Sequence, residues 1–350
     1  MTKVPNTYRT PSSLEILTCD VELGASCRGA GMGPQALLYE CNHRGIPIHT
    51  FPLTRYSGPP LTLNQLNYSS NFFMDTFLEI CEDLSEQHSS ILRRNARSLI
   101  LSGDHSTAHG FVSGMRETFP DDTIGLIWID AHGDIHSPFT SPTGNLHGMP
   151  IAAMLAEDNR GLTRNEVSEQ EINYWNELKK VGPRNIFPKL NHEDILFLEL
   201  RDLETEEWSL LQRQQMSYFT AQTRKEVGIS PIIEMTLSWA KRFDHIYVSF
   251  DVDALDATLV PGTGCPVSNG LGLDDARQLL CAVSSIPQLR AFEICEINPL
   301  LDHGNTVAER MAGLLDQIWE NLVPHESENV ILELPPKSKS AAPDRHLAAS

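Results

Sequence analysis

The stretch IGLIWIDAHGD, residues 124–134, joins a continuous apolar run to three ionisable side chains. An unbroken run of this length is typical of a strand that is buried on both faces, as in a parallel sheet. Asp130, His132 and Asp134 follow the run at intervals of two residues. Because such residues project to one side in extended backbone, the pattern predicts a metal site where a buried strand ends.

Two further clusters repeat this arrangement. Asp251 and Asp253 follow the apolar run 246–250, and His105 follows another apolar run after Gly103, which is expected to provide a turn. Any one cluster could simply be an aspartate that caps a turn or helix. Ligands of open parallel sheets collect beyond the carboxyl ends of the strands, so three clusters in such positions together favour a metal site.

The donor set indicates the kind of metal. Four carboxylates and two imidazoles suit two Mn²⁺ or similar divalent ions, and they do not suit a closed thiolate zinc site. Four adjacent carboxylates would repel one another unless cations of total charge near +4 lay between them. Two divalent ions ~3.5–4 Å apart, bridged by one oxygen, would supply that charge and make hydroxide available near neutral pH.

The rest of the chain alternates short apolar runs with helical spacing, which predicts an α/β fold with a parallel sheet. We expect residues 1–334 to form a single domain and the polar tail 335–350 to be disordered. Segments 54–70 and 159–191 are expected to be irregular. The expected strands are residues 14–18, 46–51, 98–102, 123–129, 195–200, 245–250 and 288–294, and the expected helices are 72–95, 224–242, 273–285 and 306–321.

Composition excludes several classes of partner. The 350 residues are 41% apolar and 21% charged, with a formal net charge of −19, which disfavours nucleic acid and anionic membrane surfaces. Seven scattered cysteines without a C-x-x-C pair indicate a reducing compartment. No apolar stretch approaches the ~18 residues of a membrane span, so a cytoplasmic location is expected.

Four motifs give the chain a family resemblance. They are SGDHS at 102–106, DAHGD at 130–134, SFDVDALD at 249–256 and PGTGCP at 261–266, and their order and spacing resemble the arginase-like ureohydrolases over about residues 15–315. The resemblance implies a three-layer α/β/α fold with a central, mostly parallel sheet, and hydrolysis of a guanidino C–N bond at a binuclear manganese centre, with Co²⁺ as another possible ion. The implied metal ligands are His105, Asp130, His132, Asp134, Asp251 and Asp253, with Asp130 and Asp251 bridging both ions.

The resemblance also assigns catalytic roles. Glu296, in EICEINP at 293–299, would pair with the guanidinium group and orient its carbon over a metal-bridging hydroxide. Asp134 would pass a proton to the departing amine, and His147 would carry protons between solvent and site. The ordinary alternative for His147 is a loop histidine without a task.

A second group of residues would hold the far end of the substrate. The loop 135–148 resembles arginase loops that bind an α-carboxylate, and Thr143 and Asn145 have suitable hydrogen-bonding groups, although each is also common in ordinary turns. His136 stands where arginases usually carry Asn. Glu204, with Glu207 as a helper, would receive an α-ammonium group, unless both belong to a solvated acidic loop.

Within the family the chain is most similar to arginases, which implies hydrolysis of L-arginine to L-ornithine and urea. His136 and Glu204 keep other small guanidino substrates open, as in an agmatinase, a guanidinobutyrase or a formiminoglutamase-like enzyme. A non-catalytic metal-binding scaffold is an alternative of another class, but retained Glu296 and His147 argue against it, because neither is needed merely to hold metal. The family also implies a homo-oligomer, a trimer or hexamer.

Overall fold

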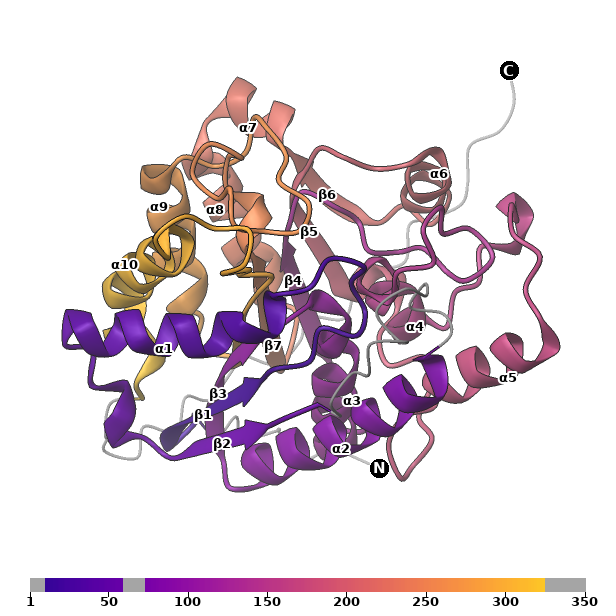
Figure 1. Cartoon of the computed structure of the whole chain (residues 1–350), viewed down its shortest axis with the longest axis horizontal. Helices are drawn as coiled ribbons and strands as arrows, with labels where there is room; N and C mark the ends of the chain where they lie inside the picture. Colours follow the sequence, from indigo (N-terminus) through magenta and orange to yellow (C-terminus); the bar gives the residue numbers. More distant parts are fainter. Residues whose placement is uncertain (1–9, 59–72, 325–350) are drawn as a thin grey trace, which may run out of the picture.

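The computed structural model describes residues 10–58 and 73–324, which form an α/β fold around one parallel sheet (Figure 1). The sheet has eight strands in the order β2-β1-β3-β8-β7-β4-β5-β6, and every neighbouring pair is parallel. The predicted fold class is therefore confirmed. The strands are β1 (Ser13–Cys19), β2 (Leu53–Tyr56), β3 (Ala96–Ser102), β4 (Ile124–Ile129), β5 (Ile195–Leu200), β6 (Ser217–Thr220), β7 (His245–Asp251) and β8 (Leu289–Cys295).

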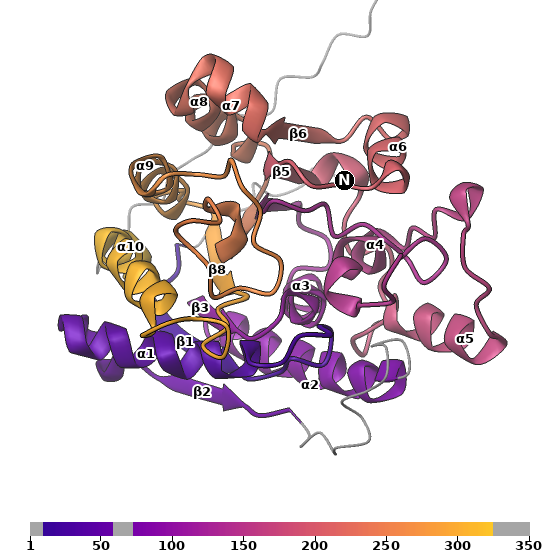
Figure 2. The same cartoon turned by 45° about the horizontal axis from the view of Figure 1, so that its top comes forward.

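Helices cover both faces of the sheet, which explains why the central strands β3, β4, β7 and β8 are buried at every position. In β4, Ile127 and Ile129 face one helical layer, while Leu126 and Trp128 face the other. The first layer contains α1 (Gly33–Arg44), α7 (Ala221–Val227), α8 (Ile229–Ala240), α9 (Leu273–Ser284) and α10 (Thr306–Leu322). The second contains α2 (Met74–Arg93), α3 (Ala108–Thr118), α4 (Pro150–Leu155), α5 (Glu169–Leu178) and α6 (Thr205–Arg213), as Figures 1 and 2 show.

The structure corrects the predicted strands at the two edges of the sheet. The predicted strand 46–51 is wrong: Pro47–Thr50 forms a 3₁₀ turn, and the edge strand β2 follows it. Proline pre-sets a turn there, and a short apolar run does not distinguish a strand from other buried backbone. The opposite edge strand, β6, was missed because it has only four residues and none of them is fully buried.

Three other predicted segments, one helical and two irregular, also need correction. Gly228, with φ 81°, separates α7 from α8 where one helix was predicted over 224–242. Segment 159–191 is not wholly irregular, since α5 begins there with a capping box between Ser168 and Glu171. Residues 54–56 belong to β2, whereas 59–70 and the predicted tail 335–350 lie outside the described residues. No helix in the described ranges combines the length and apolar composition that a membrane crossing requires.

Candidate active site

The candidate site lies at the carboxyl ends of four adjacent strands in the middle of the sheet. These strands are β3, β8, β7 and β4. Glu296 and Asp130 directly follow β8 and β4, Asp251 is the last residue of β7, and His105 comes three residues after β3. Parallel strands bring their carboxyl ends to one edge, so segments far apart in the sequence meet there. The structure thus places these predicted residues together at one edge of the sheet.

The local backbone that gathers the ligands differs from the prediction. Residues 130–132 form a bend, and Asp253 lies in a 3₁₀ turn, so neither pair converges through extended backbone. Each first aspartate instead accepts a hydrogen bond from the backbone N–H two residues later. Asp130 accepts from His132 at 2.7 Å, and Asp251 accepts from Asp253 at 2.8 Å. Such Asx turns are typical of aspartate at the end of an element, and they fix both carboxylates.

Gly103 lies in a bend after β3, as expected, and it also permits a close backbone contact. A Cβ atom at this position would lie 2.0 Å from the carbonyl oxygen of Val21. The glycine therefore allows the backbone after β3 to pack directly against the segment after β1. The Gly103 carbonyl then accepts the backbone N–H of Glu296 at 2.8 Å, which joins the ends of β3 and β8.

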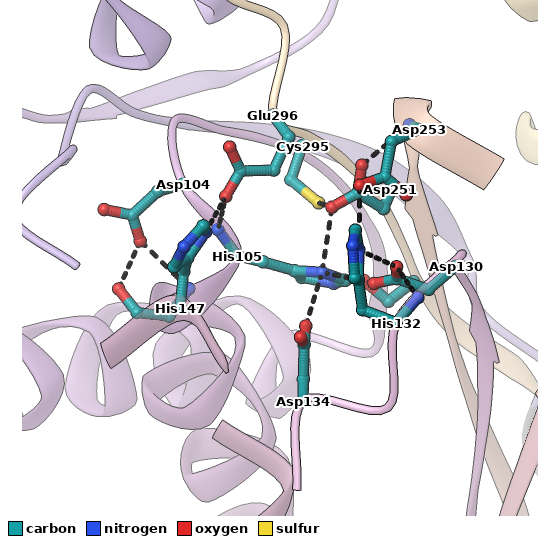
Figure 3. Close-up of polar contacts among 12 residues, drawn as sticks. Asp104, His105, Asp130, His132, Asp134, His147, Asp251, Asp253, Cys295 and Glu296 are labelled. Atoms are coloured by element: carbon teal, nitrogen blue, oxygen red, sulfur yellow. Dashed lines mark hydrogen bonds and ion pairs between the residues drawn. The ribbon is translucent and has the colours of Figure 1, made fainter. Parts of the chain in front are cut away.

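The first group of ligand atoms surrounds His105, which is buried. Its Nδ1 lies 3.0 Å from Asp130 Oδ2, 3.2 Å from Asp251 Oδ2 and 3.3 Å from Asp134 Oδ2 (Figure 3). Asp134 reaches this position from backbone at φ 51°, an uncommon conformation for a residue other than glycine. Backbone strain of this kind gathers at functional sites.

The second group surrounds His132 and shares Asp130 with the first. His132 Nδ1 lies 3.0 Å from Asp253 Oδ2 and 3.4 Å from Asp130 Oδ1. Asp130 therefore turns one oxygen toward each imidazole, as a carboxylate that bridges two ions would. For Asp251, Oδ2 faces His105 while Oδ1 accepts a backbone N–H, so its bridging role stays a prediction.

The electrostatics of these residues fit a pair of divalent cations. Burial, and after it the charge of Asp130, raises the pKa of Asp134 to about 6. Burial, Asp253 and Asp130 raise the pKa of Asp251 well above its ordinary value. His105 Nδ1 and Asp130 Oδ2 are buried and lie 3.0 Å apart, yet neither makes a hydrogen bond. Two metal-ligand atoms that face each other without a hydrogen bond between them are arranged to bind a cation.

A pocket of about 290 Å³ opens over both ligand groups. Asp130 lies beneath it, fully buried, and within the described ranges the pocket lining contains neither lysine nor arginine. All the other predicted site residues line it: His105, His132, Asp134, His136, Thr143, Asn145, His147, Glu204, Glu207, Asp251, Asp253 and Glu296. The structure thus brings together every predicted metal, catalytic and substrate-binding residue.

Glu296 and His147 form an ion pair on the wall of the pocket. Glu296 Oε1 lies 3.0 Å from His147 Nδ1 and accepts the backbone N–H of His105 at 2.9 Å. Burial lowers the pKa of His147, but the neighbouring Glu296 outweighs it and raises the pKa to about 9. Glu296 has φ 63°, so its carboxylate is held in a strained and specific position.

The outer pocket contains a second cluster of charged residues. His136 Nε2 lies 3.1 Å from Glu204 Oε2 and 3.6 Å from Glu207 Oε2, and its Nδ1 lies 3.1 Å from Thr140 Oγ1. Burial and the nearby Glu204 raise the pKa of Glu207 well above its ordinary value. The His136 imidazole therefore already contacts the two carboxylates that were predicted to bind a substrate amine.

The predicted carboxylate-binding loop lies beside this cluster. The backbone N–H of Asn145 donates to Thr143 Oγ1 at 3.1 Å, and its side-chain amide donates to Ser26 Oγ at 3.2 Å. These contacts are the turn chemistry that was the alternative interpretation, but both residues also line the pocket. Their role toward a substrate stays a prediction.

Three buried polar residues beside the site had no predicted role. Asp104 accepts the N–H of Gly24 at 2.7 Å, and the Gly24 carbonyl accepts the N–H of His147. Ser249 and Glu293 lie behind His105. Glu293 had a signal in the sequence, because an acidic residue between apolar neighbours inside a buried strand is rare without a partner.

The arrangement defines a class of protein. A parallel sheet whose central strand ends hold two ligand groups with a shared carboxylate, below a polar pocket, is the architecture of a binuclear metallohydrolase. The model of the Arginase family matches residues 13–319. The chain therefore belongs to the arginase family, and it is a metal-dependent ureohydrolase. The resemblance inferred from the motifs is confirmed.

Individual relatives agree with the family assignment. An arginase from Staphylococcus aureus (strain MRSA252) is 31% identical over 317 residues, which are 86% of this chain and 95% of that protein. The structure of Bacillus caldovelox arginase superposes with a TM-score of 0.75 at 26% identity, covering 88% of this chain and 98% of the other. Formimidoylglutamase from Bacillus subtilis shares the fold, with a TM-score of 0.68 at 17% identity over 90% of this chain and 88% of its own.

Proposed function

We propose that this protein is an arginase that hydrolyses L-arginine to L-ornithine and urea with two Mn²⁺ ions. The observation that carries the proposal is the shared carboxylate of Asp130, which faces both His105 and His132 below a pocket that also contains Glu296. The similarity to curated arginases over most of the chain supports arginine as the first substrate to test.

The residues around the metal positions would divide the chemistry among them. Two bound divalent ions would lower the pKa of a water molecule and polarise the substrate. Glu296 would accept hydrogen bonds from the guanidinium group and fix the orientation of its carbon. Asp134 would take up a proton and deliver it to the departing amine. His147 would exchange protons with solvent.

The outer pocket would hold the amino-acid end of the substrate. Glu204 and Glu207 would accept hydrogen bonds from the α-ammonium group, and Thr143 and Asn145 would donate hydrogen bonds to the α-carboxylate. His136 already contacts both glutamates, so an incoming ammonium group would have to displace or share it.

One observation favours a second candidate, a ureohydrolase for a guanidino substrate that carries an amine and no carboxylate, such as agmatine. In the described ranges the pocket lining contains four carboxylates besides the proposed metal ligands, and it contains no arginine or lysine to receive an acid. These carboxylates belong to Asp202, Glu204, Glu207 and Glu296.

A substrate panel separates the candidates. The purified protein is loaded with Mn²⁺, its metal content is measured, and product release is followed from arginine, agmatine, guanidinobutyrate and formiminoglutamate. If the protein is an arginase, kcat/KM should be highest for arginine. Hydrolysis of agmatine with no hydrolysis of arginine would favour the second candidate instead. A protein that holds two ions and hydrolyses none of the four would instead be a metal-binding scaffold.

The oligomeric state and the cellular location are further parts of the proposal. We propose a homo-oligomer, a trimer or hexamer, on the family resemblance alone, and light scattering of the purified protein tests it. All seven cysteines are free in the structure, which suits the reducing conditions of the proposed cytoplasmic location. Cell fractionation tests the location.

A further inference from the structure

A buried carboxylate behind the metal site has an unusual set of partners. Glu293 is fully buried in β8, at 0% exposure. Its two carboxylate oxygens accept hydrogen bonds from Ser102 Oγ at 2.7 Å, Ser249 Oγ at 2.8 Å and Tyr247 Oη at 2.9 Å. Within the described residues no lysine or arginine forms an ion pair with it, so three hydroxyl groups from the flanking strands β3 and β7 supply the polar contacts.

One of these hydroxyls links the carboxylate to His105. Ser249 Oγ lies 2.7 Å from His105 Nε2. A serine hydroxyl has a single proton, and a carboxylate can only accept. Because Ser249 donates its proton to Glu293, the Ser249 oxygen must accept a hydrogen bond from His105 Nε2. The ring proton of His105 therefore lies on Nε2.

The opposite nitrogen of the ring is then left as a lone-pair donor. Nδ1 is the atom that faces the carboxylates of Asp130, Asp134 and Asp251. The plane of the ring is fixed as well, since His105 stacks on Trp128 with 3.8 Å between ring centroids and 4° between planes. The network therefore prepares both the tautomer and the direction of Nδ1.

We propose that Glu293 is a positioning residue which, through Ser249, keeps the proton of His105 on Nε2 and Nδ1 free to bind a metal ion. Without an acceptor at position 293, the Ser249 hydroxyl could turn and donate to Nε2, which would place the proton on Nδ1 and block the ligand atom. Partners that orient a metal-binding histidine typically contribute 10- to 100-fold to metal affinity. The inference rests on the proposed two-metal site.

The test uses three variants of the full chain. Glu293→Gln replaces the pure acceptor with an amide that can also donate, and Ser249→Ala removes the link to His105. Tyr247→Phe is the matched control, because it removes one hydroxyl from Glu293 and leaves the link intact. The affinity for each of two Mn²⁺ ions is measured by competition with a chelator, and thermal unfolding is followed in parallel. In the Co²⁺-loaded proteins, NMR detects the shifted, exchangeable N–H proton of the coordinated His105.

We expect Glu293→Gln and Ser249→Ala to lower the affinity for one of the two ions by about 10- to 100-fold. Both changes should also speed exchange of the His105 N–H proton. Tyr247→Phe should leave both readouts close to wild type. If Glu293→Gln does not fold, Ser249→Ala alone decides the question. A loss of thermal stability in the variants with unchanged metal affinity and N–H exchange would overturn the inference.

The two proposals fail in different ways. Wild-type protein that binds no pair of ions would remove the proposed function and this inference with it. If the wild-type protein binds two ions and the Glu293→Gln and Ser249→Ala proteins bind both as tightly, only the proposed role of Glu293 is wrong.

Discussion

The inner and outer ends of the pocket are built in different ways. At the inner end Asp130, Asp251 and Asp253 lie at a strand end or within two residues of it, are buried, and accept hydrogen bonds from backbone N–H groups. At the outer end the residues lie on the loop 135–148 and at the start of α6, where the Glu204 side chain is 47% exposed. The difference teaches that the fold specifies the metal chemistry, whereas loops adjust the choice of substrate.

The largest effect is expected from a change at the inner end. Asp130→Asn removes the carboxylate that both ligand groups share, so the affinity for both ions should fall by more than ~100-fold. This loss exceeds the one that is typical when a residue that only orients a metal ligand is changed. Metal analysis after dialysis and kcat/KM with added Mn²⁺ measure the effect. Asp121→Asn, on the exposed turn before β4, is the matched control. If the Asp130→Asn protein still bound two ions as tightly as wild type, the carboxylate would not bridge them.

Glu296→Gln should separate substrate binding from metal binding. Removing one partner of a buried charge pair costs about 3–5 kcal/mol, which corresponds to a loss of roughly 150- to 5,000-fold in kcat/KM. Metal content should stay at the wild-type value, because Glu296 contacts the backbone of His105 and not its ring. Glu309→Gln, on the first turn of α10, controls for the loss of a surface charge. A loss below tenfold would argue against an ion pair with the guanidinium group.

The sequence predicted the inner end well because its signals are local. Buried strands followed at once by Asp and His leave few other positions for those side chains, so Asp130, Asp134 and Asp251 were found without the structure. The route by which they converge could not be predicted, since it depends on Asx turns and on the left-handed backbone of Asp134. Spacing in a sequence does not determine backbone dihedrals after a strand ends.

The outer end and the sheet edges were harder to predict for a different reason. The pairing of His136 with Glu204 joins residues 68 positions apart, and no periodic pattern relates them. The edge strands β2 and β6 have four residues each and are partly exposed, so their hydrophobic signal is weak. Glu293 gave a signal, but its partners come from neighbouring strands whose register only the fold determines.

A change at the outer end should affect KM and leave the metals in place. His136→Asn removes the imidazole from Glu204 and Glu207, so the pair becomes available to a substrate ammonium group. The KM for arginine should fall about threefold to tenfold, the equivalent of roughly one hydrogen bond, with little change in kcat. Steady-state kinetics with arginine and guanidinobutyrate measure it, since only arginine carries the amine. His303→Asn, on an exposed turn, is the control. An equal change for both substrates would contradict a role in amine recognition.

The last expected effect is a pH dependence of stability that comes from the ion pair between His147 and Glu296. Glu296 raises the pKa of His147 from 6.5 to about 9, so the folded protein holds this proton more tightly than the unfolded chain does. The resulting stabilisation is fully present below pH 6.5 and is lost as the pH rises through about 9. The free energy of unfolding of wild type minus that of His147→Gln should therefore shrink over this interval. Urea unfolding of the metal-free proteins at several pH values measures the difference. A difference that stays constant or grows with pH would mean that Glu296 does not hold the proton on His147.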